Sequence, residues 1–493
     1  MAYEDPEKDT IAASECIRQG TDSSKSGDDD DLNLVRHGTW DGDEDPANPQ
    51  NWPSSKKNSV VFMVSFLASI SPLASTMTAP ALPAIAKDLN ISSTPELQFT
   101  LSIYVLGYAI GPLFLAPLSE IYGRVWVSQL SNLWFMIFNL LCGFATSTPQ
   151  LLVFRFLAGL GSSTTLSVGA GVLGDCYHPG NMGSAAALYS VLPIIGPVVG
   201  PIVGGFVTQN TTWRWIFWAI SIWDAMIQII ACFVLQETYK PIILRQKNKQ
   251  LQKASGSEHD VSQNPPSIYV LLRRFVGRPL HLLGTQSLVQ ALALYLGFLN
   301  GVCYIVETTF PTLWTKRYGQ LASIGSLHYI ALGIGAIVGA QVCSSANDHI
   351  YRALSARNGG KGSPDFRLPT MLLGAILAPI GLFWYGWSAE KRLHWIMPDI
   401  GGAIYYAGFM MGLINVHMYV IDTYGINSAS AMAAVSLVQS LFGAMFPLFG
   451  ANLYTALGYG WGNSVMGFIS IGLGLPALAL LWVFGARLRK ENK

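Results

Sequence analysis

The chain alternates between long runs of apolar residues and short polar segments. Twelve of the apolar runs are about 20 residues long, which is enough for a helix to cross the hydrocarbon core of a bilayer. Lipid offers the backbone no hydrogen-bond partners, so each run is expected to be an α-helix. The runs are 59–81, 98–118, 127–146, 150–174, 184–208, 214–235, 285–309, 324–345, 368–388, 394–420, 430–454 and 461–485. The pattern predicts an all-α membrane protein with twelve transmembrane helices.

A polar segment at 236–284 divides the predicted spans into two groups of six. We expect one six-helix bundle at 58–235, a second at 285–486 and a short tail at 487–493. Residues 1–57 carry acidic runs and few bulky apolar side chains, a composition typical of a disordered tail. The predicted organisation is two helical bundles joined by a linker.

Charged residues indicate how the spans are oriented. With the N-terminus inside, 19 basic residues lie on the inner side and 6 on the outer side. This bias favours cytoplasmic termini. The glycosylation sequons at Asn90 and Asn210 both fall in predicted outer loops, which agrees with that topology. Because the N-terminal stretch is polar and acidic, we expect no cleavable signal peptide, and the first span would direct insertion.

The linker contains a short amphipathic pattern. Apolar residues recur at helical spacing between Ile268 and Val276, with Arg273, Arg274 and Arg278 among them. This pattern predicts a helix lying on the anionic inner leaflet. It could serve as a simple strap between the halves or have a regulatory role.

Composition narrows the class of protein. Of 493 residues, 51% are hydrophobic and only 12% are charged, about half the charged fraction of an average soluble protein. The net charge of +1 gives no electrostatic reason to expect a nucleic-acid partner. The six cysteines have neither metal-ligand nor disulfide spacing. We find no phosphate loop, metal cluster or nucleophile triad, so we expect neither an enzyme nor a cofactor.

The predicted fifth span carries glycines at four-residue spacing. They leave one helix face without side chains, so another helix can approach closely, and the prolines between them set the kink of the rod. The motif residues are Gly196, Pro197, Gly200, Pro201, Gly204 and Gly205. A single small-residue pair would indicate only generic packing. The complete run resembles the fifth-span antiporter motif of proton-coupled exporters of the major facilitator superfamily.

The connection between spans two and three carries an acid, a glycine turn and a base, namely Glu120, Gly123 and Arg124. It resembles the loop signature of that superfamily, although Ala116 and Val125 depart from the usual residues. Its acid and base would form a gating latch with Asp175, at the end of span four. The second half repeats the spacing with Asp348, Arg352 and Asp422. The chain therefore reads as an internal duplication, as in transporters whose halves rock about a central site.

Other stretches narrow the resemblance to the fungal branch of the twelve-span drug:proton antiporters. They are residues 45–52, 213–218, 237–241 and 419–424. The resemblance implies a monomeric exporter of small amphipathic compounds, xenobiotics or secondary metabolites, driven by protons across the plasma membrane or the vacuolar membrane. Alternatives are a proton-symporting nutrient importer, which the fifth-span motif disfavours, and a sensor built on a transporter scaffold, which would carry a longer cytosolic extension.

Few titratable groups are expected at membrane depth. Glu307 is the preferred proton carrier, because burial favours the neutral form of a carboxyl group. His328 and His417 are alternatives, and either could equally be a structural histidine. Arg155 resembles the fourth-span arginine of the family and either faces the cavity or donates to backbone carbonyls. Asp224, on peripheral span six, is interpreted as structural.

Elimination supported Glu307, because the acids of spans four and ten lie at the span ends, where they serve the latches or face bulk water. Polar and aromatic residues on the spans expected to line the cavity could bind a flat apolar substrate. These residues are Tyr104, Asn300, Tyr304, Trp314, Asn415 and Gln439.

Overall fold

The computed structural model describes residues 40, 42, 44–177, 182–255, 276–359, 362–425 and 428–491, and all secondary structure in these ranges is helical. The helices of the first half are α3 (Ser54–Thr76), α4 (Leu82–Asp88), α5 (Thr94–Tyr122), α6 (Arg124–Cys142), α7 (Thr148–Ser162), α8 (Thr164–Cys176), α9 (Met182–Asn210) and α10 (Arg214–Val234). Short 3-10 helices, η1 (Pro49–Asn51) and η2 (Ala79–Ala81), flank α3.

The linker and second half continue the helical pattern. Their elements are α11 (Lys240–Ser255), α13 (Arg278–Thr285), α14 (Ser287–Thr312), η5 (Leu313–Arg317), α15 (Ala322–Leu327), α16 (Tyr329–Arg357), η6 (Pro364–Arg367), α17 (Leu368–Glu390), α18 (Ile396–Tyr424) and α19 (Ser428–Glu491). Helix α19 bends back at Gly458, whose φ of 73° is accessible to glycine at no steric cost.

Ten helices among the described residues are long and apolar enough to cross a membrane. Two features account for the difference from the twelve predicted spans. The fourth span is interrupted at Ser163, which separates α7 from α8, and α19 contains two antiparallel crossings joined at Gly458. With α7 and α8 counted as one crossing and α19 as two, the helices correspond to the twelve predicted segments.

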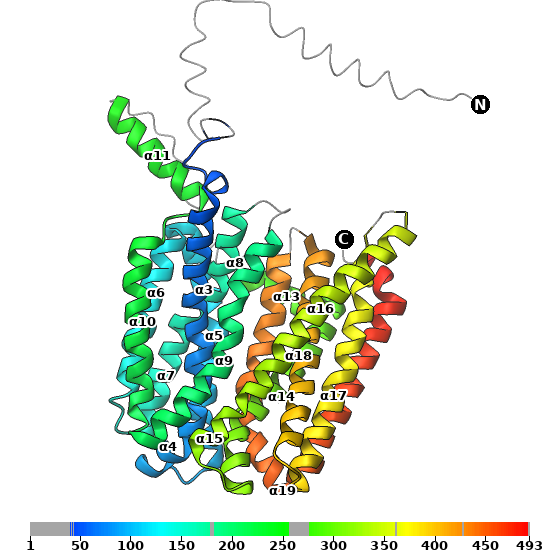
Figure 1. Ribbon diagram of the computed structural model, residues 1–493. Helices are drawn as coiled ribbons and strands as arrows, with labels where there is room; N and C mark the ends of the chain where they lie inside the picture. The colour runs from blue at the N-terminus through cyan, green and yellow to red at the C-terminus, as the bar shows by residue number, and fades with distance from the viewer. Residues whose placement is uncertain are drawn as a thin grey trace, which may run out of the picture.

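Both ends of the described chain lie at one end of the bundle, which we call the terminal face (Figure 1). Helices α4 and α15 and the bend of α19 lie at the opposite face, and α11 projects away from the bundle at the terminal face (Figure 1). Buried hydrophobic residues form two large clusters, one drawn from residues 52–235 and one from 288–481. Each half therefore has its own core.

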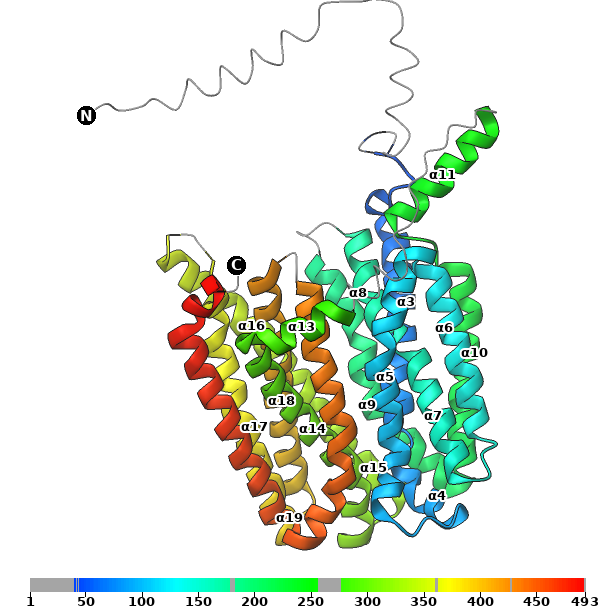
Figure 2. The same ribbon diagram turned by 180° about the vertical axis from the view of Figure 1, so that it is seen from behind.

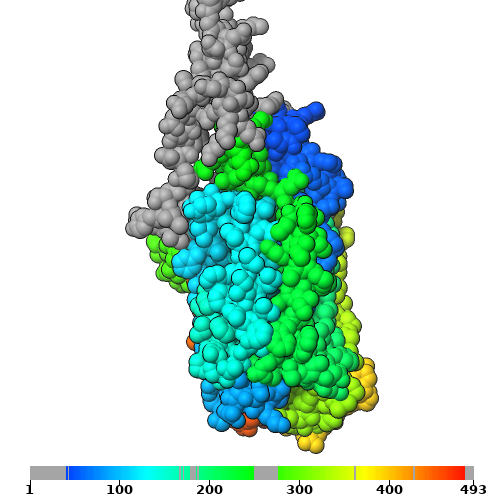
Figure 3. Space-filling model, turned by 90° about the vertical axis from the view of Figure 1, so that its left-hand side faces the viewer, coloured from blue at the N-terminus to red at the C-terminus, as the bar shows by residue number. Residues whose placement is uncertain are grey.

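The outside of the bundle is apolar, as contact with lipid tails requires. Helices α6 and α10 lie side by side on one outer face (Figure 3). Their large hydrophobic side chains are exposed there, including Trp126 at 66%, Ile222 at 55% and Phe233 at 83%. Such a surface would aggregate in water, so its natural environment is the bilayer.

The predicted disordered tail was wrong at its C-terminal end. Residues 44–57 are described and include η1 and the first turn of α3. Asp45 is buried and pairs with Lys247 of α11, with 2.7 Å between Oδ2 and Nζ. The earlier part of the tail, up to residue 39, lies outside the described residues.

Most of the predicted amphipathic helix in the linker also lies outside the described residues, which resume at 276. The described linker contains α11 and α13 instead. Helix α13 packs against α19 at the terminal face (Figure 2). The C-terminal end of the linker is therefore anchored to the second bundle.

Candidate functional site

Helix α9 lies where the two halves meet, because its glycines admit close neighbours on two sides. A Cβ atom at Gly200 would lie 2.5 Å from Thr76 Oγ1 of α3, and one at Gly204 would overlap the Met77 carbonyl oxygen. On the other side, a Cβ atom at Gly205 would overlap the hydroxyl of Ser326 in α15. The fifth span thus joins α3 of its own half to α15 of the other half.

At the opposite face, a hydrogen bond also connects the two halves. The backbone N–H of Ser323 donates to Gln209 Oε1 at 3.0 Å, which links the end of α9 to the start of α15. Gly196 completes the glycine face, because a Cβ atom there would lie 3.1 Å from Cγ of Pro72 in α3, closer than an ordinary van der Waals contact. Pro197 and Pro201 are part of the same helix, which continues unbroken from Met182 to Asn210.

Four tyrosines gather at the centre of this interface. Tyr108 of α5 has Tyr104, Tyr189 and Tyr304 as electrostatic neighbours, so helices α5, α9 and α14 each contribute a phenol group. Tyr108, Tyr189 and Tyr304 are half-buried, whereas Tyr104 is fully buried. We call this set the central tyrosine cluster. Amphipathic rings between two helical halves are suited to contact flat organic molecules.

Tyr104 and Arg155 belong to a buried network in the first half. The Tyr104 hydroxyl donates to Ser162 Oγ at 2.8 Å and lies 3.1 Å from Ser71 Oγ. The guanidinium carbon of Arg155 stands 4.8 Å above the Tyr104 ring, close enough for a cation–π interaction. Tyr104 is therefore held in the packed interior of the first half.

Arg155 itself is 1% exposed. It donates to backbone carbonyls, which is one of the two roles that the sequence suggested for it. Its Nε donates to the Thr100 carbonyl and its Nη1 to the Ala74 carbonyl, both at 3.2 Å. Its Nη2 is buried with no hydrogen-bond partner. The N–H groups of Nη2 therefore stay available for a ligand or water, while Nε and Nη1 hold α3 and α5 together.

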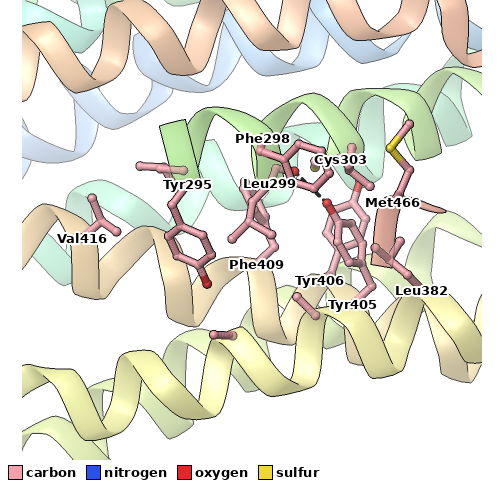
Figure 4. Packing of buried hydrophobic residues seen from close by; sticks show 14 of the residues in the cluster. Tyr295, Phe298, Leu299, Cys303, Leu382, Tyr405, Tyr406, Phe409, Val416 and Met466 are labelled. Atoms are coloured by element: carbon pink, nitrogen blue, oxygen red, sulfur yellow. Dashed lines mark hydrogen bonds between the residues drawn. The ribbon is translucent and has the colours of Figure 1, made fainter. Parts of the chain in front are cut away.

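Glu307 is a buried carboxylate in α14 with 7% exposure. Its Oε1 accepts a hydrogen bond from the Tyr406 hydroxyl at 3.0 Å, and the Cys303 thiol lies 3.7 Å away. Tyr405 and Tyr406 of α18 reach α14 beside Cys303 (Figure 4). The Tyr329 hydroxyl donates to the Glu307 backbone carbonyl. In the described part of the chain, hydrogen-bond donors contact the carboxylate and no cation does.

Glu307 is connected to Arg155 through the central tyrosine cluster. Tyr304 has both Glu307 and Tyr104 as electrostatic neighbours, and Tyr104 lies under the Arg155 guanidinium. Tyr304 is thus a neighbour of the acid of the second half, and Tyr104 is a neighbour of the base of the first half. This arrangement crosses the interface between the halves.

Asn300 and Gln439 lie together beside Tyr304. Asn300 Nδ2 donates to the Gln439 carbonyl oxygen at 2.9 Å, and the two side-chain amides are 3.4 Å apart. Gly443 leaves room for Asn300 and Tyr304, since a Cβ atom there would lie within 3.0 Å of both side chains. These three predicted cavity residues therefore form one group between α14 and α19.

Two of the predicted cavity residues pack against other helices of the second half in this structure. Asn415 is fully buried and bonds Asn347 of α16 and Thr370 of α17, each at 2.9 Å. Trp314 is also fully buried and stacks on His328 with 3.6 Å between ring centroids. Their role in a substrate cavity stays a prediction, because the sequence indicates which span a residue is on but not which neighbour it faces.

His328 lies in a polar cluster near the opposite face. Its Nδ1 is 2.6 Å from Asp399 Oδ2 of α18, and its Nε2 is 2.9 Å from Gln320 Oε1. Asp399 is 7% exposed. Elimination expected the acids of span ten to serve the latches or face bulk water, but Asp399 is buried. An acid inside the predicted apolar run 394–420 was the signal that could have identified it.

The remaining titratable candidates are separate from this cluster. His417 of α18 is half-buried, and its Nε2 is among the buried atoms without a hydrogen-bond partner. Asp224 of α10 is fully buried and accepts a hydrogen bond from Asn132 of α6 at 2.8 Å. Asp224 therefore ties two outer helices together, as its structural interpretation requires.

The first-half latch residues meet at the terminal face. Arg124 Nε lies 3.5 Å from Asp175 Oδ2, and Arg124 Nη1 donates to Ser119 Oγ at 2.8 Å. Glu237 caps the start of α6 by accepting from the backbone N–H of Arg124 at 2.9 Å. Gly123 has a φ of 101°, and any side chain there would overlap the Glu237 carboxylate. Glu120 is half-buried near Tyr239.

In the sequence, Glu237 is one residue of the stretch 237–241 that resembles the fungal branch of the family, and no structural role could be predicted for it. The structure gives it a specific place, because an acidic residue at a helix N-terminus satisfies unpaired N–H groups and complements the helix dipole. Thr238 beside it donates to Asp175 Oδ2 at 3.2 Å. The segment after α10 thus completes the first-half latch.

The second-half latch differs from the predicted one. Asp422 at the end of α18 pairs with Arg367, with 2.5 Å between Oδ2 and Nε. Arg352 is exposed and donates to the Asp348 carbonyl of its own helix at 2.9 Å. The predicted pairing of Arg352 with Asp422 was therefore wrong, because α16 continues to Arg357 and carries Arg352 past the point where the matching helix of the first half ends.

The two sequon asparagines are exposed: Asn90 follows the end of α4, which lies at the opposite face, and Asn210 is the last residue of α9, beside the Gln209 contact with α15. Their modification stays a prediction. Within the described ranges, no group of three histidine, cysteine or acidic side chains is placed to hold a metal ion.

Comparison with protein families and curated proteins places this geometry in context. A model of the Major Facilitator Superfamily matches residues 64–426. The chain is 42% identical over 467 residues to a Penicillium aethiopicum protein named efflux pump vrtL, covering 94% of this chain and 92% of that protein. It is 37% identical over 470 residues to efflux pump radE of Floropilus chiversii, covering 94% and 86%.

Solved structures share the fold at low sequence identity. The Escherichia coli xylose transporter XylE, in a partially occluded inward-open conformation, aligns with a TM-score of 0.65 at 15% identity over 87% of this chain and 98% of that one. A bacterial homologue of the lysosomal transporter Spinster aligns with a TM-score of 0.61 at 15% identity over 90% and 99%.

Proposed function

The chain belongs to the major facilitator superfamily, and from that premise we propose that it exports small amphipathic organic molecules in exchange for protons by alternating access. The direction of transport is inferred from the relatives, which are named efflux pumps. The substrate class follows from the central tyrosine cluster and the neighbouring amides of Asn300 and Gln439. Rings with a few polar groups are typical of sites for compact, largely apolar ligands.

One observation carries the proposal of proton coupling. Glu307 is a buried carboxylate whose partners among the described residues are the Tyr406 hydroxyl and the Cys303 thiol, next to the interface that must open from each side in turn. A neutral carboxyl is tolerated in such surroundings, whereas the charged form needs water, a substrate or the free Nη2 of Arg155. Proton binding and substrate binding at Glu307 would therefore compete, which is the condition for exchange.

We place the protein in the plasma membrane as a monomer with both termini in the cytosol; the vacuolar membrane is the second location consistent with the proposal. The orientation rests on the 19 to 6 distribution of basic residues and on the two sequons at the opposite face. The monomer rests on the presence of both halves in one chain. In this orientation the terminal face, with its two latches, is the cytosolic one.

The test is a Glu307→Gln variant of the full chain, reconstituted in phosphatidylcholine vesicles with ethidium as a first amphipathic probe. With a gradient of about one pH unit, one coupled proton supports about tenfold accumulation, since 1.4 kcal/mol corresponds to a factor of ten. We expect the variant to lose this accumulation and to keep the exchange of labelled for unlabelled ethidium. The readouts are ethidium fluorescence and tracer flux.

The matched control is Asp224→Asn, which also replaces a buried acid by its amide but lies between the outer helices α6 and α10. We expect Asp224→Asn to retain gradient-driven accumulation. Uphill transport by the Glu307→Gln protein at the level of the unsubstituted protein would rule out Glu307 as the proton carrier. It would direct attention to His417 and to the His328–Asp399 pair.

A further inference from the structure

A groove of about 570 Å³ lies on the outside of the second half, between α15 and α16 on one side and α18 on the other. Its volume is within the range of about 300–1,000 Å³ usual for small-molecule sites. Its walls are branched aliphatic side chains that face the bilayer, among them Ile330 at 46%, Ile334 at 55% and Ile400 at 38% exposure. We call it the lateral groove. It is separate from the central tyrosine cluster.

One end of the lateral groove is polar. His328 and Asp399 line it, with 2.6 Å between Nδ1 and Oδ2, and Gln320 lines it beside them. The Asp399 side chain is only 9% exposed, and its Oδ1 is buried with no hydrogen-bond partner. A buried carboxylate oxygen without a donor costs free energy unless a ligand supplies one. The polar end of the groove therefore holds a carboxylate oxygen that has no donor, on a residue that lines the groove.

The polar end of the lateral groove lies near the opposite face and its apolar part lies deeper in the membrane, which is the orientation of an amphiphilic lipid in a bilayer. Asp399 lies three residues from the start of α18, or about 4.5 Å into the helix at 1.5 Å per residue. Ile334 lies six residues beyond His328 on α16, so the apolar part extends about 9 Å further from the opposite face. At its inner end the helices close on each other, because a Cβ atom at Gly335 would overlap the backbone of Ala403.

We propose that the lateral groove binds a membrane sterol-like alcohol, whose single hydroxyl donates to Asp399 Oδ1 and whose flat apolar body lies along Ile330, Ile334 and Ile400. Both nitrogens of His328 lie within hydrogen-bond distance of side-chain oxygens, Asp399 Oδ2 and Gln320 Oε1. Asp399 Oδ2 therefore already has a partner in the imidazole, and the ligand has only to supply a donor to Oδ1. A neutral hydroxyl adds no charge at this depth, whereas a cationic ligand would leave one.

The dimensions favour a ring system over an acyl chain. An apolar length of about 9 Å with a closed inner end covers a compact fused-ring body but only part of an acyl chain. Trp395, which is 46% exposed, lies at the polar end with its ring beside His328 at 5.7 Å between centroids. A tryptophan at the membrane boundary is typical of the level where a lipid hydroxyl sits.

The test uses the full chain in phosphatidylcholine vesicles that contain a photoreactive cholesterol analogue with a free hydroxyl and a diazirine on the ring system. After illumination, labelled peptides are identified by mass spectrometry. We expect labels on the groove-facing residues of α16 and α18. Cholesterol should compete for labelling about tenfold more strongly than its methyl ether, which corresponds to about 1.4 kcal/mol for the lost hydroxyl donor.

Two matched variants locate the site without touching the polar pair. Ile334→Trp fills the lateral groove, whereas Ile376→Trp makes the same change at an exposed position of α17, which is 43% exposed and does not line the groove. We expect Ile334→Trp to reduce labelling of α16 and α18 about tenfold or more and Ile376→Trp to leave it unchanged. Gel filtration and ethidium exchange show that both variants are folded.

Three results would overturn the proposal. Equal competition by cholesterol and its methyl ether would show that the sterol hydroxyl does not donate to Asp399. Undiminished labelling in folded Ile334→Trp would place the sterol elsewhere. Stronger labelling of the groove by a photoreactive diacylglycerol would assign it to an acyl-chain lipid instead. None of these outcomes bears on proton coupling at Glu307, so this inference stands apart from the proposed function.

Discussion

At the scale of single residues, buried polar side chains divide into those that hold helices together and those that face the centre. Asn415 and Asn300 are both asparagines on cavity-lining spans. Asn415 has no exposed surface and connects three helices, whereas Asn300 is 8% exposed and pairs only with Gln439 beside Tyr304. Their substitution should therefore affect different properties.

We expect Asn415→Leu to lower the free energy of unfolding by about 2–4 kcal/mol, because Asn347 and Thr370 lose partners and a buried donor left alone costs about 1–3 kcal/mol. The affinity for ethidium should stay unchanged in the protein that remains folded. Thermal unfolding and ethidium binding in detergent provide the two measurements.

Asn300→Leu is the comparison. It should leave the unfolding temperature nearly unchanged and weaken ethidium binding severalfold. If Asn415→Leu weakens binding at unchanged stability, Asn415 contributes to the substrate site in a conformation other than this one.

At the scale of elements, the glycine face of α9 decides how closely the halves approach. Gly200 and Gly204 face α3, and Gly205 faces α15 of the other half. A side chain on this face cannot be accommodated by a rotamer change, because Gly204 meets the backbone of Met77. Close backbone approach of this kind is what small residues provide between membrane helices.

Gly204→Leu should therefore abolish transport while part of the protein still reaches the membrane, since overpacking costs about 1–3 kcal/mol or more and separates α9 from α3. Val203→Leu is the matched control, because Val203 is the preceding residue and is 38% exposed on the outside of α9. Ethidium efflux normalised to surface expression is the measurement. Full efflux by Gly204→Leu would show that the glycine face is dispensable for export.

At the scale of the whole molecule, the two halves place a basic residue at the same structural position. Arg124 is the first residue of α6, the third crossing of its half, and Arg367 directly precedes α17, the third crossing of the other. Each pairs with an aspartate at the end of the following crossing, Asp175 or Asp422. The internal repeat is therefore visible in the ion pairs once Arg367 replaces Arg352.

We expect Arg124→Gln and Arg367→Gln to shift the resting population towards the conformation open at the terminal face. A cysteine introduced at Leu188 of α9, in a background with Cys16→Ser and Cys232→Ser, would report this by its reaction with an impermeant maleimide from that face. The rate should rise by up to about fivefold, because a partly exposed ion pair contributes about 0.2–1 kcal/mol. The effect should weaken at high salt.

Arg352→Gln serves as the control, since Arg352 is exposed and bonds only its own helix in the described contacts. It should leave the labelling rate unchanged. Identical rates in all three variants would count against the latches as gating elements.

The sequence alone determined the number and order of the spans, because crossing a bilayer requires about 20 apolar residues in succession and that requirement is local. It also located the glycine face of α9, since a four-residue spacing is a property of one helix. The internal repeat was detectable from Glu120–Arg124 and Asp348–Arg352, but the matching of spacing selected Arg352 instead of Arg367.

Only the tertiary structure decided which polar residues meet. Asn415, Trp314 and Asn300 have similar settings along the chain, yet the first two are enclosed within the second half and the third reaches the centre. Asp399 and His328 are 71 residues apart, so no local pattern joins them. The physical reason is that a helix shows its periodicity in the sequence, whereas the rotation of each helix about its axis is set by packing against several others at once.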